Sequence, residues 1–299
     1  MIDKKKPAKA VGAYLVLLGT LALGLAELSA VQNEIKSKLS ITSDFSFLDP
    51  AMLLAIGVPI VVVTAWQFFR RKQHWAQIWY LCGVPLGVII SALNLVSLLQ
   101  NADSPEDYGQ TIAKSLLAIG YGGLVSVVGY QSSIKIVGDR LSAPKPFAAR
   151  DLWLIPMTLV LPIIYANSLT SFGAVFYAPA ILIFTGLLIF PLLLNSKVLV
   201  SRVQILSESS IMASLGCVLC ALIVYYDGDG VPLLLGPPIA VGLLGLIYGA
   251  TTIFILAILA GPEQLKLSNF PLRIWHLLEI YGLWVLMCFA PMALQEAFG

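Results

Sequence analysis

The stretch GQTIAKSLLAIGYGG, Gly109 to Gly123, returns further along the chain as GPPIAVGLLGLIYGA, Gly236 to Ala250. The two stretches align without a gap, so that Gly109 pairs with Gly236 at an offset of 127 residues. They share Ile-Ala, Leu-Leu and Tyr-Gly at matching positions. Each copy opens an apolar helix after an acidic segment. We therefore expect an internal duplication of helical units.

The composition excludes a soluble globular domain. Of the 299 residues, 59% are hydrophobic and 11% are charged, whereas soluble domains carry about 25% charged residues. The apolar runs are about 18 to 25 residues long, which is the length that a helix needs to cross about 30 Å of hydrocarbon. The sequence therefore predicts an all-α polytopic membrane protein in a lipid bilayer, with about nine spans at 11–31, 48–69, 78–99, 111–134, 152–169, 177–195, 210–226, 234–260 and 272–294.

The basic residues predict the orientation of these spans. If the N-terminus is cytoplasmic, every Lys and Arg except Lys36, Lys38 and Lys114 falls in a segment on the inner side, as the positive-inside rule requires. The C-terminus is then external. The segments NADSPEDYG and YYDGDGVP are expected to be short external loops, serving either as turns or as an acidic mouth that attracts cations. Pro156 and Pro162 predict a kinked or partly re-entrant fifth span.

The duplication extends beyond the opening stretch. FLDPAMLLAIG, Phe47 to Gly57, corresponds to FYAPAILIFTG, Phe176 to Gly186. Four spans return the chain to the same side of the membrane, so the repeats are parallel. We expect a first four-span repeat at 1–140, a second at 150–265 and an extra C-terminal span at 270–299. Such a chain corresponds to two protomers of an ancestral oligomer joined in tandem.

These motifs resemble the MotA/TolQ/ExbB proton-channel family. The family's DPxxLL motif is matched by Asp49, Pro50, Leu53 and Leu54, and its GPxIAxALLTTxYG pattern is matched by both quoted stretches. The resemblance implies a membrane subunit of an ion-driven motor or channel complex in the bacterial inner membrane. It also implies an oligomer around single-span MotB/TolR/ExbD-like partner helices. The transported ion would be H+ or Na+, and no other cofactor is expected.

The sequence departs from the family at the ion route. The paired threonines of the pattern are replaced by Ala118 and Ile119 in one copy, and by Gly245 and Leu246 in the other. Only RRKQHWAQ lies between the second and third spans, where the MotA branch has a large cytoplasmic insertion. The alternative function is a non-conducting scaffold or ring component of a larger envelope machine. A secondary transporter is a third hypothesis, based on the repeats and the broken spans.

The candidate site lies on the repeated helices. Small residues recur at i, i+3 and i+7, which places them along one helix face. Such a face allows helices to approach closely, and a narrow pore lining has the same requirement. With the neighbouring tyrosines, the candidates are Ser115, Ala118, Tyr121, Gly122, Gly242, Gly245, Tyr248 and Gly249.

Three ionisable residues fall inside predicted spans, where a charge is costly unless it is paired or hydrated. Glu27 and Lys114 both lie near the external side, and we expect them to form an ion pair; the alternatives are side chains that snorkel to the interface and a channel gate. Glu279 lies one turn after His276 in the ninth span. It either pairs near the headgroups or imitates the ion-carrying carboxylate of a partner helix.

The remaining chemistry predicts neither an enzyme nor a nucleic-acid-binding protein. The chain has two His residues and no Gly-rich phosphate loop or Ser-His-Asp arrangement. All four cysteines fall in apolar runs, where thiols act as small hydrophobic groups. They are Cys82, Cys217, Cys220 and Cys288. We expect no disulfide and no metal site.

Overall fold

The computed structural model of the chain describes residues 49–71, 75–101, 105–134, 153–169, 175–194, 202–227, 232–259 and 274–285. Within these ranges the chain is helical nearly throughout and has no strand, which confirms the all-α class. Five of the described helices are long and apolar enough to cross a membrane, at Pro50–Phe69, Trp75–Leu99, Thr111–Ser133, Val203–Val224 and Pro238–Leu259. The total of about nine spans stays a prediction, and the predicted first span lies outside the described residues.

The first half of the described chain contains helices α2 (Pro50–Trp66), α3 (Trp75–Asn101) and α4 (Pro105–Ile134). A short π-helical segment, η1 (Gln67–Arg71), continues α2. The second half contains α5 (Leu154–Leu169), α6 (Ala178–Leu194), α7 (Arg202–Asp227) and α8 (Pro232–Leu259). A shorter apolar helix follows at Ile274–Val285, and we call it the C-terminal helix.

Two helix boundaries differ from the sequence-based prediction. Helix α4 begins at Pro105, so Glu106 and Asp107 belong to its first turn and not to an external loop. Proline is favoured at the first helical position, which agrees with this start. Helix α7 begins at Arg202, eight residues before the predicted span. In its polar first turns Gln204 donates to Glu208 one turn later, at 3.2 Å, and such a pair contributes a few tenths of a kcal/mol to the helix.

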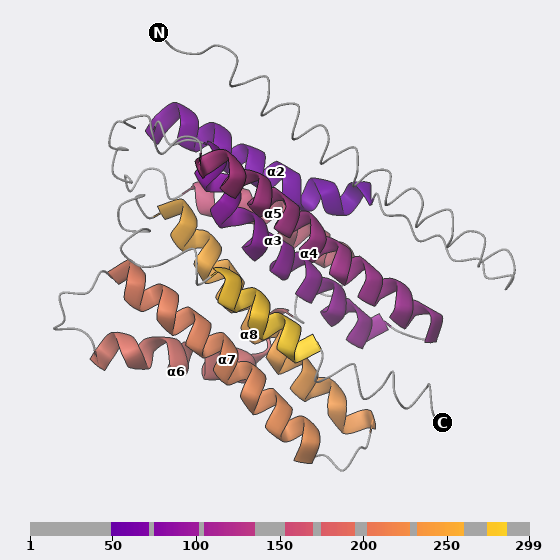
Figure 1. The fold of residues 1–299 in the computed structure, drawn as a ribbon. Helices are drawn as coiled ribbons and strands as arrows, with labels where there is room; N and C mark the ends of the chain where they lie inside the picture. The colour runs from indigo at the N-terminus through magenta and orange to yellow at the C-terminus, as the bar shows by residue number, and fades with distance from the viewer. Residues whose placement is uncertain are drawn as a thin grey trace, which may run out of the picture. The chain divides into compact units, whose positions relative to one another are not determined.

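The described helices form two groups that meet between α3 and α8 (Figure 1). In the first group α2 packs on α3 and α4, and α3 packs on α4. In the second group the same contacts recur, because α6 packs on α7 and α8, and α7 packs on α8. Helix α5 follows the first group in sequence and packs on α2 and α3. Helices α4, α3, α8 and α7 therefore succeed one another in a row.

The core along this row is apolar, with α3 and α8 at its centre. Leu86, Ile90 and Leu95 of α3 and Leu243 and Leu244 of α8 are fully buried. A few polar contacts join the groups. Gln67 of η1 donates from Nε2 to the carbonyl oxygen of Ile258 at 2.9 Å, which satisfies one of the backbone acceptors that the end of α8 leaves open.

Candidate functional site

The small-residue face of α4 meets α3 at a close backbone crossing. The Gly122 backbone touches α3 at two glycines, because a Cβ on Gly83 would lie 2.5 Å from the Gly122 carbonyl oxygen. A Cβ on Gly87 would lie 2.9 Å from the Ala118 carbonyl oxygen. Conversely, a Cβ on Gly122 would lie 2.8 Å from the Gly87 Cα atom. Only glycine fits at these three positions without moving backbone.

Ser126 extends this crossing one turn along α4. Its hydroxyl donates to the Tyr80 carbonyl oxygen at 3.0 Å and accepts from the Val84 amide at 2.9 Å. In a regular helix these two α3 groups would bond directly to each other. Pro85 follows inside α3, and a proline opens the preceding helical turn. The Ser126 hydroxyl bonds to both backbone groups and ties α4 to α3.

The small-residue face of α8 meets α7 in the same way. Gly249 packs against Ser214, and Gly245 packs against Cys217. The Ser214 hydroxyl donates to the Gly245 carbonyl oxygen at 3.0 Å, and its geometry also permits a bond to Ser210 O of its own helix at 3.0 Å. Ser210 donates to the Gly249 carbonyl oxygen at 3.2 Å. Serine hydroxyls therefore occupy the positions where α3 has glycines.

The two crossings are related by the same offset of 127 residues that relates the opening stretches. Gly122 corresponds to Gly249, and its α3 contacts correspond to the α7 contacts of Gly249. The corresponding contact residues are Gly83 with Ser210 and Gly87 with Ser214. The predicted four-span repeats pair the third span with the seventh, but sequence analysis did not give the residue register between α3 and α7. The identities at this offset are few: the dipeptide Gln-Ile at 77–78 and 204–205, and leucine at Leu95 and Leu222.

Ser115 and Gly242, the first small residues of the two faces, have different surroundings. Ser115 is buried and donates to the Thr111 carbonyl oxygen of its own helix at 2.8 Å. Gly242 packs against the indole of Trp284 in the C-terminal helix. Tyr121 is half-buried beside the core of the first group. The structure thus uses these candidates in helix packing, and it brings the two small-residue faces to different partners.

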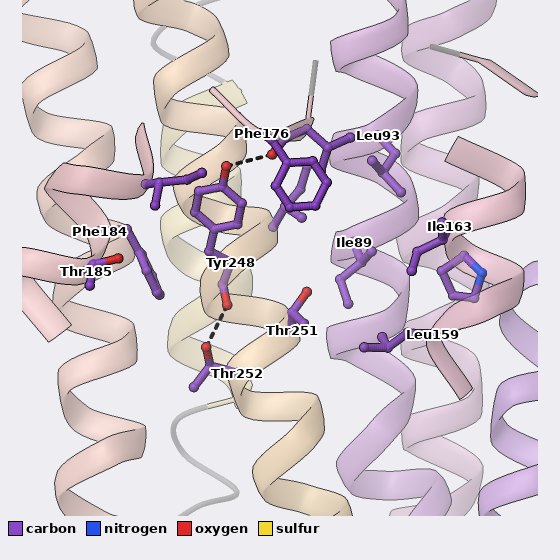
Figure 2. A pocket seen from close by; sticks show the side chains of 14 residues that line it. Ile89, Leu93, Leu159, Ile163, Phe176, Phe184, Thr185, Tyr248, Thr251 and Thr252 are labelled. Carbon is purple, nitrogen blue, oxygen red and sulfur yellow. Dashed lines mark hydrogen bonds between the residues drawn. The ribbon is translucent and has the colours of Figure 1, made fainter. Parts of the chain in front are cut away.

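A cavity of about 460 Å³ lies where the two groups meet (Figure 2). Its walls come from α3, α5, α6, α8 and the segment before α6, and they are almost entirely apolar. Tyr248 of α8 lines it and donates its hydroxyl hydrogen bond to the Val175 carbonyl oxygen at 2.7 Å. Thr251 and Thr252 line the cavity on the next turn of α8. Such a cavity suits a hydrocarbon segment.

Two polar contacts hold other helices on α3, and sequence analysis missed both. Ser91 and Tyr281 of the C-terminal helix share a hydrogen bond of 2.5 Å. Tyr165 of α5 donates to Asn94 Oδ1 at 2.9 Å. The Asn94 Nδ2 atom has no hydrogen-bond partner among the described residues. Both contacts could have been suspected from polar residues at the centre of an apolar span. Such a residue needs a hydrogen-bond partner within the protein, because lipid offers none.

The charged candidates are placed only in part. Lys114 is on the exposed side of α4, and Glu27 lies outside the described residues, so their ion pair stays a prediction. Glu279 is 71% exposed and lies 3.0 Å from Nδ1 of His276. The buried side of the C-terminal helix is formed instead by apolar and aromatic residues such as Leu277, Tyr281 and Trp284.

The core of the described residues contains no charged side chain. Its buried polar side chains are serines, one threonine, one asparagine and one glutamine. These groups can hold helices together through hydrogen bonds, but they do not titrate in the physiological range. Comparison of the chain with protein-family models, with curated proteins and with solved structures finds no match. The class that the fold defines is therefore an all-α protein with the apolar helices of a membrane protein.

Proposed function

We propose that the chain is a scaffold subunit of a larger membrane assembly, built from two fused MotA/TolQ/ExbB-like units. The observation that carries this proposal is the filling of both small-residue faces by neighbouring helices of the same chain. Gly122 meets the α3 backbone, and Gly249 meets the Ser214 side chain. Ala118 and Gly245, which stand where the resemblance expects the first of the paired threonines, also contact neighbouring helices, at Gly87 and Cys217.

The composition of the core supports the same function. An ion that crosses a membrane needs charged or titratable groups, or a line of hydrated polar groups. Some of the buried polar side chains of the described residues pair across helices, as Ser126 does with the Tyr80 carbonyl oxygen and Ser214 with the Gly245 carbonyl oxygen. Hydrogen bonds between membrane helices contribute about 0.6 kcal/mol each on average. Together with close backbone packing, they hold the helices of each group together.

An ion-driven motor or channel subunit is the second candidate, and one observation favours it. Tyr248, Thr251 and Thr252 gather hydroxyl groups on the side of α8 that faces the cavity. A carboxylate on a single-span partner helix would then carry H+ or Na+, with these hydroxyls alongside. This function places the ion at the cavity, where α8 faces α3, α5 and α6 of the same chain.

An ion-flux measurement separates the two functions. The complex would be purified in mild detergent with all its bound subunits and reconstituted into vesicles that contain a pH-sensitive dye. A potassium gradient with valinomycin then drives proton entry, and a tracer measures Na+. The scaffold function predicts entry rates equal to those of vesicles without protein, with a protonophore as the positive control. Entry above that background, lowered by Tyr248→Phe, would favour the channel.

A further inference from the structure

The cavity where the two helix groups meet has the size of a small-molecule site and an opening toward the outside. Its volume is about 460 Å³, which is roughly three times that of the 150 Å³ cavity that holds a benzene ring and within the range of ligand pockets. Ile163 of α5 and Phe176 before α6 line it and are also 44% and 57% exposed. The cavity therefore opens beside α5, where an apolar molecule can enter from the bilayer.

The residues that line the cavity exclude a charged ligand. No charged side chain is among these lining residues. A charged group would lose its hydration there without gaining a partner. The rings of Phe176, Phe184 and Tyr248 line the space instead (Figure 2), and aromatic side chains offer faces and edges on which a flat ring packs. The lining thus favours an uncharged ligand that contains a ring.

The Thr251 hydroxyl lies in this apolar lining without a partner among the described residues. Its neighbours are already bonded, because Tyr248 donates to the Val175 carbonyl oxygen and Thr252 donates to the Tyr248 carbonyl oxygen. Figure 2 shows the Thr251 hydroxyl turned toward the space beside Ile89. A hydroxyl group away from water needs a hydrogen-bond partner. The cavity is therefore suited to a ligand that carries an acceptor.

The depth of Thr251 decides which lipid can supply that acceptor. In the membrane-length helix Pro238–Leu259, a rise of 1.5 Å per residue places Thr251 roughly 4 Å from the middle of the span. The ester carbonyls of phospholipids lie at the boundary of the hydrocarbon layer, roughly 15 Å from its middle. They do not reach Thr251, whereas an uncharged lipid that enters the hydrocarbon layer does.

We propose that the cavity binds an uncharged lipid with a carbonyl-bearing ring, which is the chemistry of a membrane quinone, and that Thr251 donates a hydrogen bond to the carbonyl oxygen. The ring packs among the aromatic side chains, and the apolar tail leaves past Ile163 and Phe176 into the bilayer. The proposal concerns binding alone and includes no electron transfer. It goes beyond the scaffold function and does not depend on it, because the whole site lies within one chain.

Photolabelling of the full-length chain in lipid nanodiscs tests the proposal. The probe is a short-tailed ubiquinone with an azido group on its ring, and the labelled peptides are identified by mass spectrometry. Saturable labelling of α5, α6 or α8 is expected, and unlabelled decylubiquinone is expected to displace the probe. Dodecylbenzene has a ring and a tail but no carbonyl. It is expected to displace the probe about fivefold less well, which is the ordinary effect of one hydrogen bond.

Two matched pairs of variants locate the ligand. Thr251→Val keeps the side-chain shape, removes the unbonded hydroxyl and is expected to weaken probe binding about fivefold. Thr252→Val also alters a lining residue, but its hydroxyl is bonded within α8, and binding is expected to be unchanged. Ile163→Trp is expected to block the opening and abolish saturable labelling. Ile164→Trp, at an exposed neighbour that does not line the cavity, is expected to leave labelling intact.

The outcomes distinguish the proposed ligand from other occupants of the cavity. Labelling that Ile163→Trp abolishes but Thr251→Val leaves unchanged means that the cavity takes any hydrocarbon chain, which overturns the quinone assignment. Labelling that does not saturate, or that Ile163→Trp leaves unchanged, means that phospholipid chains or another part of the chain fill the cavity, and it overturns the proposal. Equal circular dichroism spectra exclude misfolding of the variants. The competition with dodecylbenzene uses the unaltered chain, so equal displacement by both competitors overturns the carbonyl contact without any substitution.

Discussion

Replacing Gly122 by alanine is expected to weaken the packing of α4 on α3, because Gly122 faces backbone atoms of α3. The added Cβ would lie 2.8 Å from the Gly87 Cα atom and 3.0 Å from the Gly87 nitrogen. Carbon atoms pack best at about 3.5–4.0 Å, so the two helices must separate by roughly 1 Å. Overpacking a tight core costs about 1–3 kcal/mol, and we expect a loss near the upper value because no side chain can rotate away.

The measurement is the free energy of unfolding in mixed micelles, followed by circular dichroism as sodium dodecyl sulfate is added. A loss of about 3 kcal/mol corresponds to a change of roughly a hundredfold in the unfolding equilibrium. Gly120→Ala on the same helix is the matched control, since nothing lies within 4 Å of its added Cβ. It is expected to be neutral, or stabilising by up to about 1 kcal/mol. Equal midpoints for the two variants would refute the close backbone crossing.

Three further predictions concern the hydrogen bonds that join the helices. Ser126→Ala removes the hydroxyl between Tyr80 and Val84 and is expected to lower the free energy of unfolding by about 1–2 kcal/mol. Ser133→Ala is the control, because its exposed hydroxyl bonds only within α4. It is expected to change the free energy of unfolding by less than about 0.5 kcal/mol. A double-mutant cycle of Ser91→Ala with Tyr281→Phe is expected to give a coupling of about 0.6–1.7 kcal/mol. A coupling of zero would contradict the 2.5 Å contact. Tyr248→Phe releases the Val175 carbonyl oxygen and is expected to speed amide hydrogen exchange at the start of α6, with α4 as the internal reference. Unchanged exchange there would show that this bond does not hold the segment.

The sequence predicts that the chain is helical and roughly where the helices lie, because both follow from the lengths and positions of the apolar runs. The predicted second and third spans, 48–69 and 78–99, match α2 and α3 closely. The start of α7 was predicted too late because Glu208 and its neighbouring serines interrupt the apolar run. Local bonds such as Gln204 to Glu208 contribute to the helix there. An apolar run in the sequence marks the part of a helix that crosses lipid. It does not show where a polar end of the same helix begins.

The pairing of helices was harder to predict than the helices themselves. The small residues at Gly122 and Gly249 indicated close packing, but the identity of their partners depends on glycine or serine at single positions of α3 and α7. No apolar periodicity reveals those partners. The Asn94–Tyr165 bond likewise joins residues 71 positions apart. Contacts of this kind depend on tertiary geometry, and only a structure or co-varying sequences reveal them.

An experimental structure of the assembled complex in lipid tests the central claim most directly, because it shows what covers the small-residue faces of α4 and α8. The scaffold predicts that Gly122 touches the α3 backbone and that Gly249 touches Ser214, with no water between them. It also predicts that the two crossings superimpose at an offset of 127 residues. A continuous line of water, or a partner helix carrying a carboxylate, seated on either face would contradict the scaffold and establish an ion route there.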